Sequence, residues 1–189
     1  MEKTLNLFQE ISKRLLQDEQ SHPVSHFIPS EEVFEKLDLS LQETAMVEED
    51  FAASLTQIVL ASPKTATRAF FNQLFGGRNE KAVLGDLLAV MLNNSMYTYK
   101  AAGAQIGVEK VILDTVCKMI GWGEHGGGTI APGGSMTNFM GMLMARDAKD
   151  ANIRKGGFSQ KMTVYTSTES HYSIPKNASF SGIGRQQVR

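Results

Sequence analysis

The chain has 189 residues and a net charge of −1, with 42% hydrophobic and 21% charged residues. This length fits one domain, or one domain with a helical extension, and the composition allows a real hydrophobic core. The near-zero net charge gives no support for a general nucleic-acid or membrane-surface binder, and no window is apolar enough for a membrane span.

The single cysteine, Cys117, excludes an internal disulfide and fits a reducing compartment. The N-terminal residues carry charges throughout and lack the apolar run of a signal peptide. We therefore expect a soluble, cytoplasmic protein.

Helical patterns dominate the first two-thirds of the chain. Leu5, Phe8 and Leu15 fall on one face of a predicted N-terminal helix, and a linker with two prolines follows. Two later helices are expected to end near Pro63 and at Gly121. The expected segments are the linker over 21–30, helices over 43–61, 83–93 and 104–120, and a loop over 71–79.

The pattern changes after Gly121, where glycine clusters appear. A helical pattern over 138–149 is followed by "MTVYTS" (162–167), which alternates and is rich in β-branched residues, as a strand should be. A short helix is expected over 173–180, and "GIGRQQVR" predicts a turn into another strand. This order predicts an α/β fold with a parallel sheet.

The predicted sheet has too few strands for a complete α/β domain. We expect a helical N-terminal segment over 1–62 and the first part of a large parallel-sheet domain over 63–189. The last residues, "QQVR", stop where a strand should be starting, so the sequence looks cut off rather than finished.

The stretch "TIAPGGSMTNFMG" (129–141) predicts an anion site in front of a helix. Gly133 and Gly134 allow backbone N–H groups to approach an anion closely, Ser135 can donate its hydroxyl, and the helix start adds partial positive charge. A monophosphate needs no lysine here. The alternative is that Ser135 is only an N-cap, and these residues alone do not separate the two.

Two other motifs compete for the same residues. The spacing from Gly128 to Ser135 matches a P-loop except that glycine replaces the phosphate-binding lysine. "HGGG" (125–128) is similar to an esterase oxyanion-hole segment, but the chain has Thr137 where the nucleophile elbow needs a second glycine. Both interpretations are weaker than a single-phosphate site.

His171 follows the predicted strand, at the end where α/β proteins place their sites. A lone histidine is more often structural than catalytic. A histidine in the same α/β unit as a predicted phosphate site is a better candidate for a functional residue. The residues Glu124, His125, Glu169 and His171 lack zinc-site spacing, so no metal is expected.

These motifs together resemble the group II amino acid decarboxylases, which depend on pyridoxal 5'-phosphate and include glutamate and cysteine sulfinate decarboxylases. The resemblance runs from about residue 51 to 188. It rests on "FNQLFGG", "NNSMYTYKAAGAQIGVEKVIL", "GTIAPGGSMTNFMGMLMARD" and "TSTESHYSIPKNASFSGIG", in that order. "FNQLF" and "MYTY" are most similar to the members that act on acidic amino acids.

The resemblance implies a fold type I pyridoxal-phosphate enzyme, a lyase, usually a homodimer with its site at the subunit interface. Gly134 and Ser135 would hold the cofactor phosphate, and His171 would stack on the pyridine ring as a catalytic residue. Substrate contacts would come from Gln73, Leu74, Phe75 and Thr98. No nucleic-acid or membrane partner is implied.

Two family residues have no match in this sequence, namely the Schiff-base lysine, which usually follows a histidine, and the aspartate beside the pyridine nitrogen. None of the four histidines is followed by lysine. We therefore expect this chain to supply the phosphate-binding and ring-stacking half of a decarboxylase and to be inactive alone. The alternatives are a truncated, non-enzymatic remnant that binds other subunits and, less well supported, an esterase.

Overall fold

The computed structural model describes residues 1–22, 24, 28–41, 43–72 and 74–189. These residues form two compact units, 1–93 and 94–189. The predicted domain boundary after residue 62 is a different division and stays a prediction.

The first unit is helical throughout its regular structure. Helices α1 and α3 pack on one another, and Ile11 of α1 and Thr56 of α3 are buried. Lys64, which follows α3, is buried and pairs with Asp18 of α1, so the chain after α3 is tied back to α1. The helices are α1 (Glu2–Ser21), α2 (Val33–Lys36), α3 (Glu48–Ala61) and α4 (Glu80–Leu92).

The second unit begins with α5 (Tyr99–Ala102), α6 (Ala104–Met119) and the 3-10 helix η1 (Gly123–His125). Cys117 of α6 is buried against the glycine segment that follows η1. A Cβ atom added to Gly126 would lie 2.7 Å from the Cys117 sulfur. The first glycine of "HGGG" therefore has a packing role, because only glycine allows this approach of the backbone.

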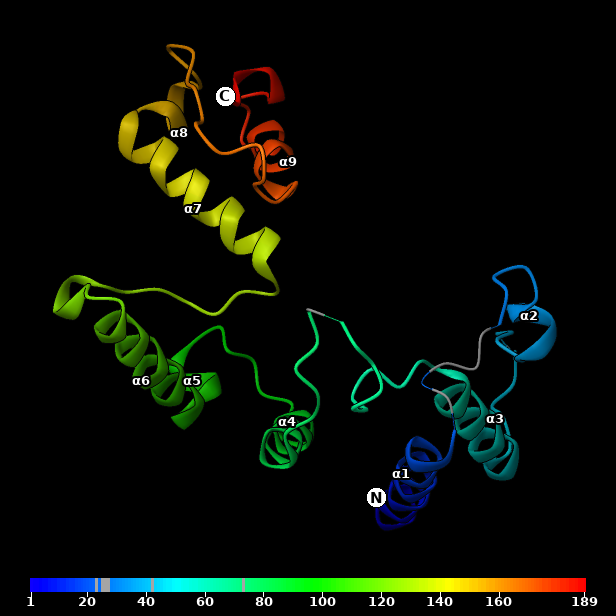
Figure 1. Cartoon of the computed structure of the whole chain (residues 1–189). Coiled ribbons are helices and arrows are strands. Elements are labelled where there is room, and N and C mark those ends of the chain that lie inside the picture. The colour runs from blue at the N-terminus through cyan, green and yellow to red at the C-terminus, as the bar shows by residue number, and fades with distance from the viewer. Residues whose placement is uncertain (23, 25–27, 42, 73) are drawn as a thin grey trace. The chain divides into compact units, whose positions relative to one another are not determined.

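Helix α9 (Ser173–Phe180) lies alongside α7 (Gly134–Lys149) in the rest of this unit (Figure 1). The Phe139 and Phe180 rings meet edge to face with centroids 6.4 Å apart. Arg146 of α7 donates to the carbonyl of Ser181, 2.8 Å away, just after α9. The two helices are thus joined near the C-terminal end of α9 by an aromatic contact and a charged hydrogen bond.

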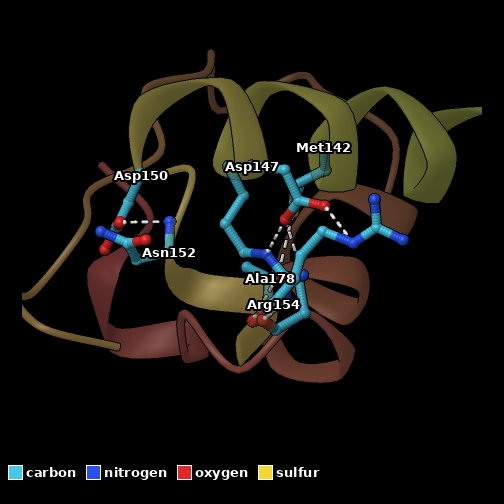
Figure 2. Close-up of polar contacts among 8 residues, drawn as sticks. Met142, Asp147, Asp150, Asn152, Arg154 and Ala178 are labelled. Carbon is cyan, nitrogen blue, oxygen red and sulfur yellow. Dashed lines mark hydrogen bonds and ion pairs between the residues drawn. The ribbon is translucent and has the colours of Figure 1, made fainter. Parts of the chain in front are cut away.

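The short helix α8 (Ile153–Gly156) follows α7 and is linked to it by charge. Asp147 receives two hydrogen bonds from Arg146 and lies 3.7 Å from the Nε of Arg154 (Figure 2). The nearby carboxylate of Asp150 accepts from the backbone N–H of Asn152 at 3.0 Å (Figure 2). These contacts fix the turn that leaves α7.

A parallel pairing joins the two segments predicted as strands. The N–H of Val164 donates to Gln187, and the carbonyl of Val164 accepts from Arg189, at 3.0 and 2.9 Å. The parallel arrangement is confirmed at this one bridge, which follows the 3-10 helix η2 (Arg185–Gln187). Within the described residues the segment 162–167 forms this isolated bridge and no regular strand, so the strand predicted there is wrong in its extent. A regular strand needs a neighbour along its whole length, and the partner segment pairs with it only around Val188.

The helix over 173–180 has the predicted limits, and three others differ at their starts. The helix expected over 43–61 begins at Glu48, the one expected over 83–93 begins at Glu80, and the one expected over 138–149 begins at Gly134. The last of these differences arises because Gly133, with φ 88° and ψ 156°, takes a backbone conformation that ends the loop there. Gly134 and Ser135 are then already helical.

Several helices keep apolar side chains on their surfaces. Among the described residues, no helix is long and apolar enough to cross a membrane. The exposed apolar residues include Leu84, Leu88, Val90 and Met91 on α4 and Val108, Val111, Ile112 and Val116 on α6.

Candidate functional site

The start of α7 is open to a ligand. Met136 and Thr137 donate their backbone N–H groups to the carbonyl of Gly133. The N–H groups of Gly134 and Ser135, and the Ser135 hydroxyl, make no hydrogen bond to any residue that the structure describes. The first turn of this 16-residue helix therefore offers three donors without a partner among the described residues, at the positive end of the helix dipole.

The cap residue of this helix is Gly133, and no side chain caps it. The alternative in which Ser135 serves only as the N-cap is therefore wrong, because Ser135 lies inside the first turn. Its hydroxyl is left available to a ligand rather than to the helix. This arrangement fits the phosphate of a cofactor, which needs several N–H and O–H donors and no lysine.

Glu109 of α6 holds the segment that enters this turn. One carboxylate oxygen accepts from the Thr129 hydroxyl at 3.0 Å and from the Ile130 N–H at 2.8 Å. The hydrogen bond from Ile130, followed by that from Thr129, holds the pKa of the Glu109 carboxyl below its ordinary value. The segment that leads into the start of α7 is thus held to α6 by the carboxylate of Glu109.

His171 is connected to α7 through Ser173. The His171 Nδ1 lies 2.9 Å from the hydroxyl of Ser173, which also receives the side-chain amide of Asn138 at 2.9 Å. The Tyr172 ring lies against His171, with centroids 4.3 Å apart and planes inclined by 37°. Because Tyr172 occupies one face of the imidazole, a stacked ligand ring would take the opposite face.

Asn177 forms a second link between α9 and the start of α7. Its side-chain amide donates to the Ser135 carbonyl at 2.9 Å, and the residue is only 3% exposed. The structure therefore brings Gly134, Ser135 and His171 into one packed module of α7 and α9. Their roles toward a cofactor remain predictions.

Three of the four predicted substrate residues are described by the structure, and they belong to other segments of the chain. Leu74 and Phe75 belong to the first unit, where Leu74 is 80% exposed and Phe75 packs edge to face on Phe70 at 5.3 Å. Gln73 lies outside the described residues. Thr98 belongs to the second unit and caps α5 by accepting from the Ala101 N–H at 3.4 Å. The substrate roles of these four residues stay predictions.

Sequence reasoning did not assign roles to Asn138, Ser173 and Asn177. All three lie within the quoted motifs. Nothing in the linear pattern shows that Asn138 of α7 contacts α9, or that Ser173 and Asn177 of α9 contact α7. The available signal was the spacing of Ser173, which follows His171 by two residues and can form a local hydrogen bond to it.

Lys176 lies on α9 and contacts aromatic side chains. Its ammonium lies over the Tyr172 and Phe180 rings, 6.0 and 5.7 Å from their centroids.

Comparison with known proteins matches residues 30–189 to the family described as "Pyridoxal-dependent decarboxylase conserved domain". Cysteine sulfinic acid decarboxylase of Mus musculus is 34% identical, with 89% of this chain and 34% of that protein covered. Acidic amino acid decarboxylase GADL1 of Mus musculus is also 34% identical, with 87% and 30% covered. The crystal structure of mouse CSAD matches with a TM-score of 0.90 and 32% identity, over 99% of this chain and 41% of that chain.

The chain therefore spans about a third of the length of the curated relatives it matches. The matched part includes both the open start of α7 and the His171 segment.

Proposed function

Because the chain belongs to the pyridoxal-dependent decarboxylase family, we propose that it supplies the phosphate-binding and ring-stacking half of a site that decarboxylates an acidic amino acid. The observation that carries this proposal is the uncapped start of α7, joined to His171 by hydrogen bonds through Asn138 and Ser173. In this assignment residues 63–189 are the first part of the cofactor-binding domain, and the cofactor is pyridoxal 5'-phosphate.

The phosphate contacts come from the first turn of α7. The N–H groups of Gly134 and Ser135 and the Ser135 hydroxyl would donate to phosphate oxygens, assisted by the helix dipole. Asn177 supports these donors because its side-chain amide holds the carbonyl of Ser135, the residue that supplies two of them. Backbone donors of this kind are already oriented before a ligand arrives, so little ordering is needed on binding.

His171 would hold the cofactor ring. The imidazole face opposite Tyr172 is suited to stack on a flat heteroaromatic ring, and an imidazole can also hold or move a proton. Bound pyridoxal phosphate supplies an electron sink for the electron pair left at the substrate α-carbon when carbon dioxide departs. The protein's part is to fix the phosphate, keep the ring in place and exclude competing orientations.

The proposed substrates are acidic amino acids such as cysteine sulfinate, aspartate and glutamate. Support comes from "FNQLF" and "MYTY" and from relatives whose names specify cysteine sulfinic acid and acidic amino acids. Gln73 can donate a hydrogen bond to a side-chain carboxylate or sulfinate but cannot neutralise its charge. An arginine from another part of the site is expected to do that.

Cofactor titration tests the phosphate assignment. Pyridoxal phosphate is added to the chain and to Ser135→Ala, and binding is followed by its visible absorbance. The variant should bind about 5- to 30-fold more weakly, which corresponds to about 1–2 kcal/mol for one hydrogen bond to a charged group. Ser179→Ala, an exposed serine on α9, is the control and should bind as the parent chain does. Equal affinities for the parent and Ser135→Ala would refute the assignment.

Carbon dioxide release tests the substrate class, with the protein expressed from its complete gene. Faster turnover of tryptophan than of cysteine sulfinate, aspartate and glutamate would contradict the proposed preference. No turnover together with no cofactor binding would favour the alternative of a non-enzymatic remnant that binds other subunits.

A homodimer is part of the proposal. The exposed apolar residues of α4 and of α6 are the kind of surface that subunit contacts cover. Sedimentation velocity over a range of concentrations is the measurement, and a monomer at every concentration would contradict it.

A further inference from the structure

Asn138 of α7, Ser173 of α9 and His171 just before α9 form a connected polar chain near the start of α7. Asn138 lies near the start of α7, Ser173 begins α9, and His171 precedes it. The Asn138 amide and the Ser173 hydroxyl are 2.9 Å apart, as are the Ser173 hydroxyl and the His171 Nδ1. Ser173 has no exposed surface, so its hydroxyl has no access to water as an alternative partner.

The direction of these hydrogen bonds assigns the position of the imidazole proton. The backbone N–H of Ser173 donates to the His171 Nδ1 at 3.2 Å, so that ring nitrogen is an acceptor. The Asn138 amide donates to the Ser173 oxygen, which leaves the hydroxyl proton of Ser173 to be donated to the same Nδ1. Two donors on Nδ1 require that this nitrogen carries no proton, so the ring proton lies on Nε2.

We propose that Asn138 and Ser173 are positioning residues that hold His171 in its Nε2–H form, with Nδ1 turned toward the protein. This inference rests on the proposed function in one respect, that His171 faces the cofactor ring. The Nε2 atom makes no hydrogen bond within the part of the chain that the structure describes, so its proton is available to a ligand. The polar chain thus decides which ring atom can donate in the site.

The buried hydroxyl matters because the imidazole has two neutral forms. In water both forms occur, and each hydrogen bond to Nδ1 shifts the balance toward Nε2–H. Removing the hydroxyl leaves only the backbone donor. One hydrogen bond of ordinary strength corresponds to a change of about fivefold in the ratio of the two forms.

Nitrogen-15 NMR of the imidazole rings measures this ratio directly and needs no cofactor. The His171 signals are assigned by their loss in His171→Gln. The spectra are recorded at a pH high enough for imidazoles to be neutral. The parent chain should show Nδ1 as the unprotonated nitrogen. Ser173→Ala should lower the ratio of Nε2–H to Nδ1–H by about fivefold.

Asn138→Asp provides a second variant, at an exposed position on α7. Its carboxylate can only accept, so it draws the Ser173 hydroxyl proton toward α7 and should lower the same ratio. Ser181→Ala is the matched control. This serine is also buried and close to α9, but its hydroxyl contacts the Ala178 carbonyl and the Met142 sulfur.

The proposal is overturned if the parent ring carries its proton on Nδ1. It is also overturned if both Ser173→Ala and Asn138→Asp leave the ratio unchanged, or if Ser181→Ala changes it equally. Failure of the cofactor assignment is separate, because it appears as absent pyridoxal phosphate binding while the cofactor-free NMR result stands.

Discussion

Gly133→Ala tests whether the anion seat depends on an unusual backbone conformation. Gly133 caps α7 with φ 88° and ψ 156°, a region that residues with a side chain rarely occupy. A Cβ added at this position would meet no atom within 4 Å. The substitution therefore introduces backbone strain without a steric clash, and any loss of stability reports on the conformation itself.

The expected magnitude follows from this geometry. A residue with a side chain held in such a region costs about 1–3 kcal/mol. Gly134→Ala is the matched control, since Gly134 is the first helical residue, has no positive φ and also has open space around it. Alanine is up to about 1 kcal/mol better than glycine inside a helix, so this neighbouring substitution should be neutral or stabilising.

Hydrogen exchange at the first turn of α7 is the most direct assay. The N–H groups of Met136 and Thr137 both donate to the Gly133 carbonyl, at 3.1 and 3.3 Å, so they report on the strained residue. In Gly133→Ala these two amides should exchange about 5- to 150-fold faster, which is the equivalent of the strain energy. Unchanged exchange, or equal acceleration in Gly134→Ala, would refute the reasoning.

Three further predictions concern other contacts within the second unit. The pKa of the Glu109 carboxyl is lowered in the folded chain, so its stabilisation is present above its ordinary value of 4.5 and is lost as the pH falls through the lowered value. Urea unfolding should therefore show an acid-induced loss that Glu109→Gln lacks; parallel pH profiles would contradict this. Asn177→Ala should destabilise the second unit by about 1–3 kcal/mol, because it leaves a backbone carbonyl of α7 without its buried donor; an unaltered urea midpoint would argue against that role. Gly182→Ala should lower the thermal midpoint more than Gly184→Ala, since both have positive φ but only the former would place a Cβ 2.8 Å from the Phe158 ring; equal losses would exclude the ring contact as the cause.

The fold class and the cofactor could be predicted from the sequence because their signals are local. Two glycines and a serine before a helical pattern predict an anion site through backbone geometry alone. The limits of α9 were also predictable, since its pattern is short and bounded by His171 and Gly182. The family match confirms the group II decarboxylase resemblance and the dependence on pyridoxal phosphate.

The function of Ser135 within its helix could not be decided from sequence. A serine before a helical pattern fits either an N-cap or a first-turn ligand residue, and a shift of two positions separates them. The positive φ of Gly133 makes that residue the cap and places Ser135 inside the turn. Glycine allows a positive φ but does not require it. The glycine in the sequence therefore does not show by itself that Gly133 is the cap.

The connection between the seat and His171 required the tertiary structure. Asn138 and Ser173 are 35 positions apart, and Asn177 and Ser135 are 42 apart. No periodicity relates residues at such separations; they meet because α9 packs on α7 through Phe139 and Phe180. The sequence by itself determined which residues are candidates to bind a phosphate and to stack on a ring, since those predictions depend on local backbone and side-chain chemistry. Which nitrogen of His171 carries the proton was decided by helix packing, because only a folded chain can bring a buried hydroxyl and a distant amide to the same imidazole.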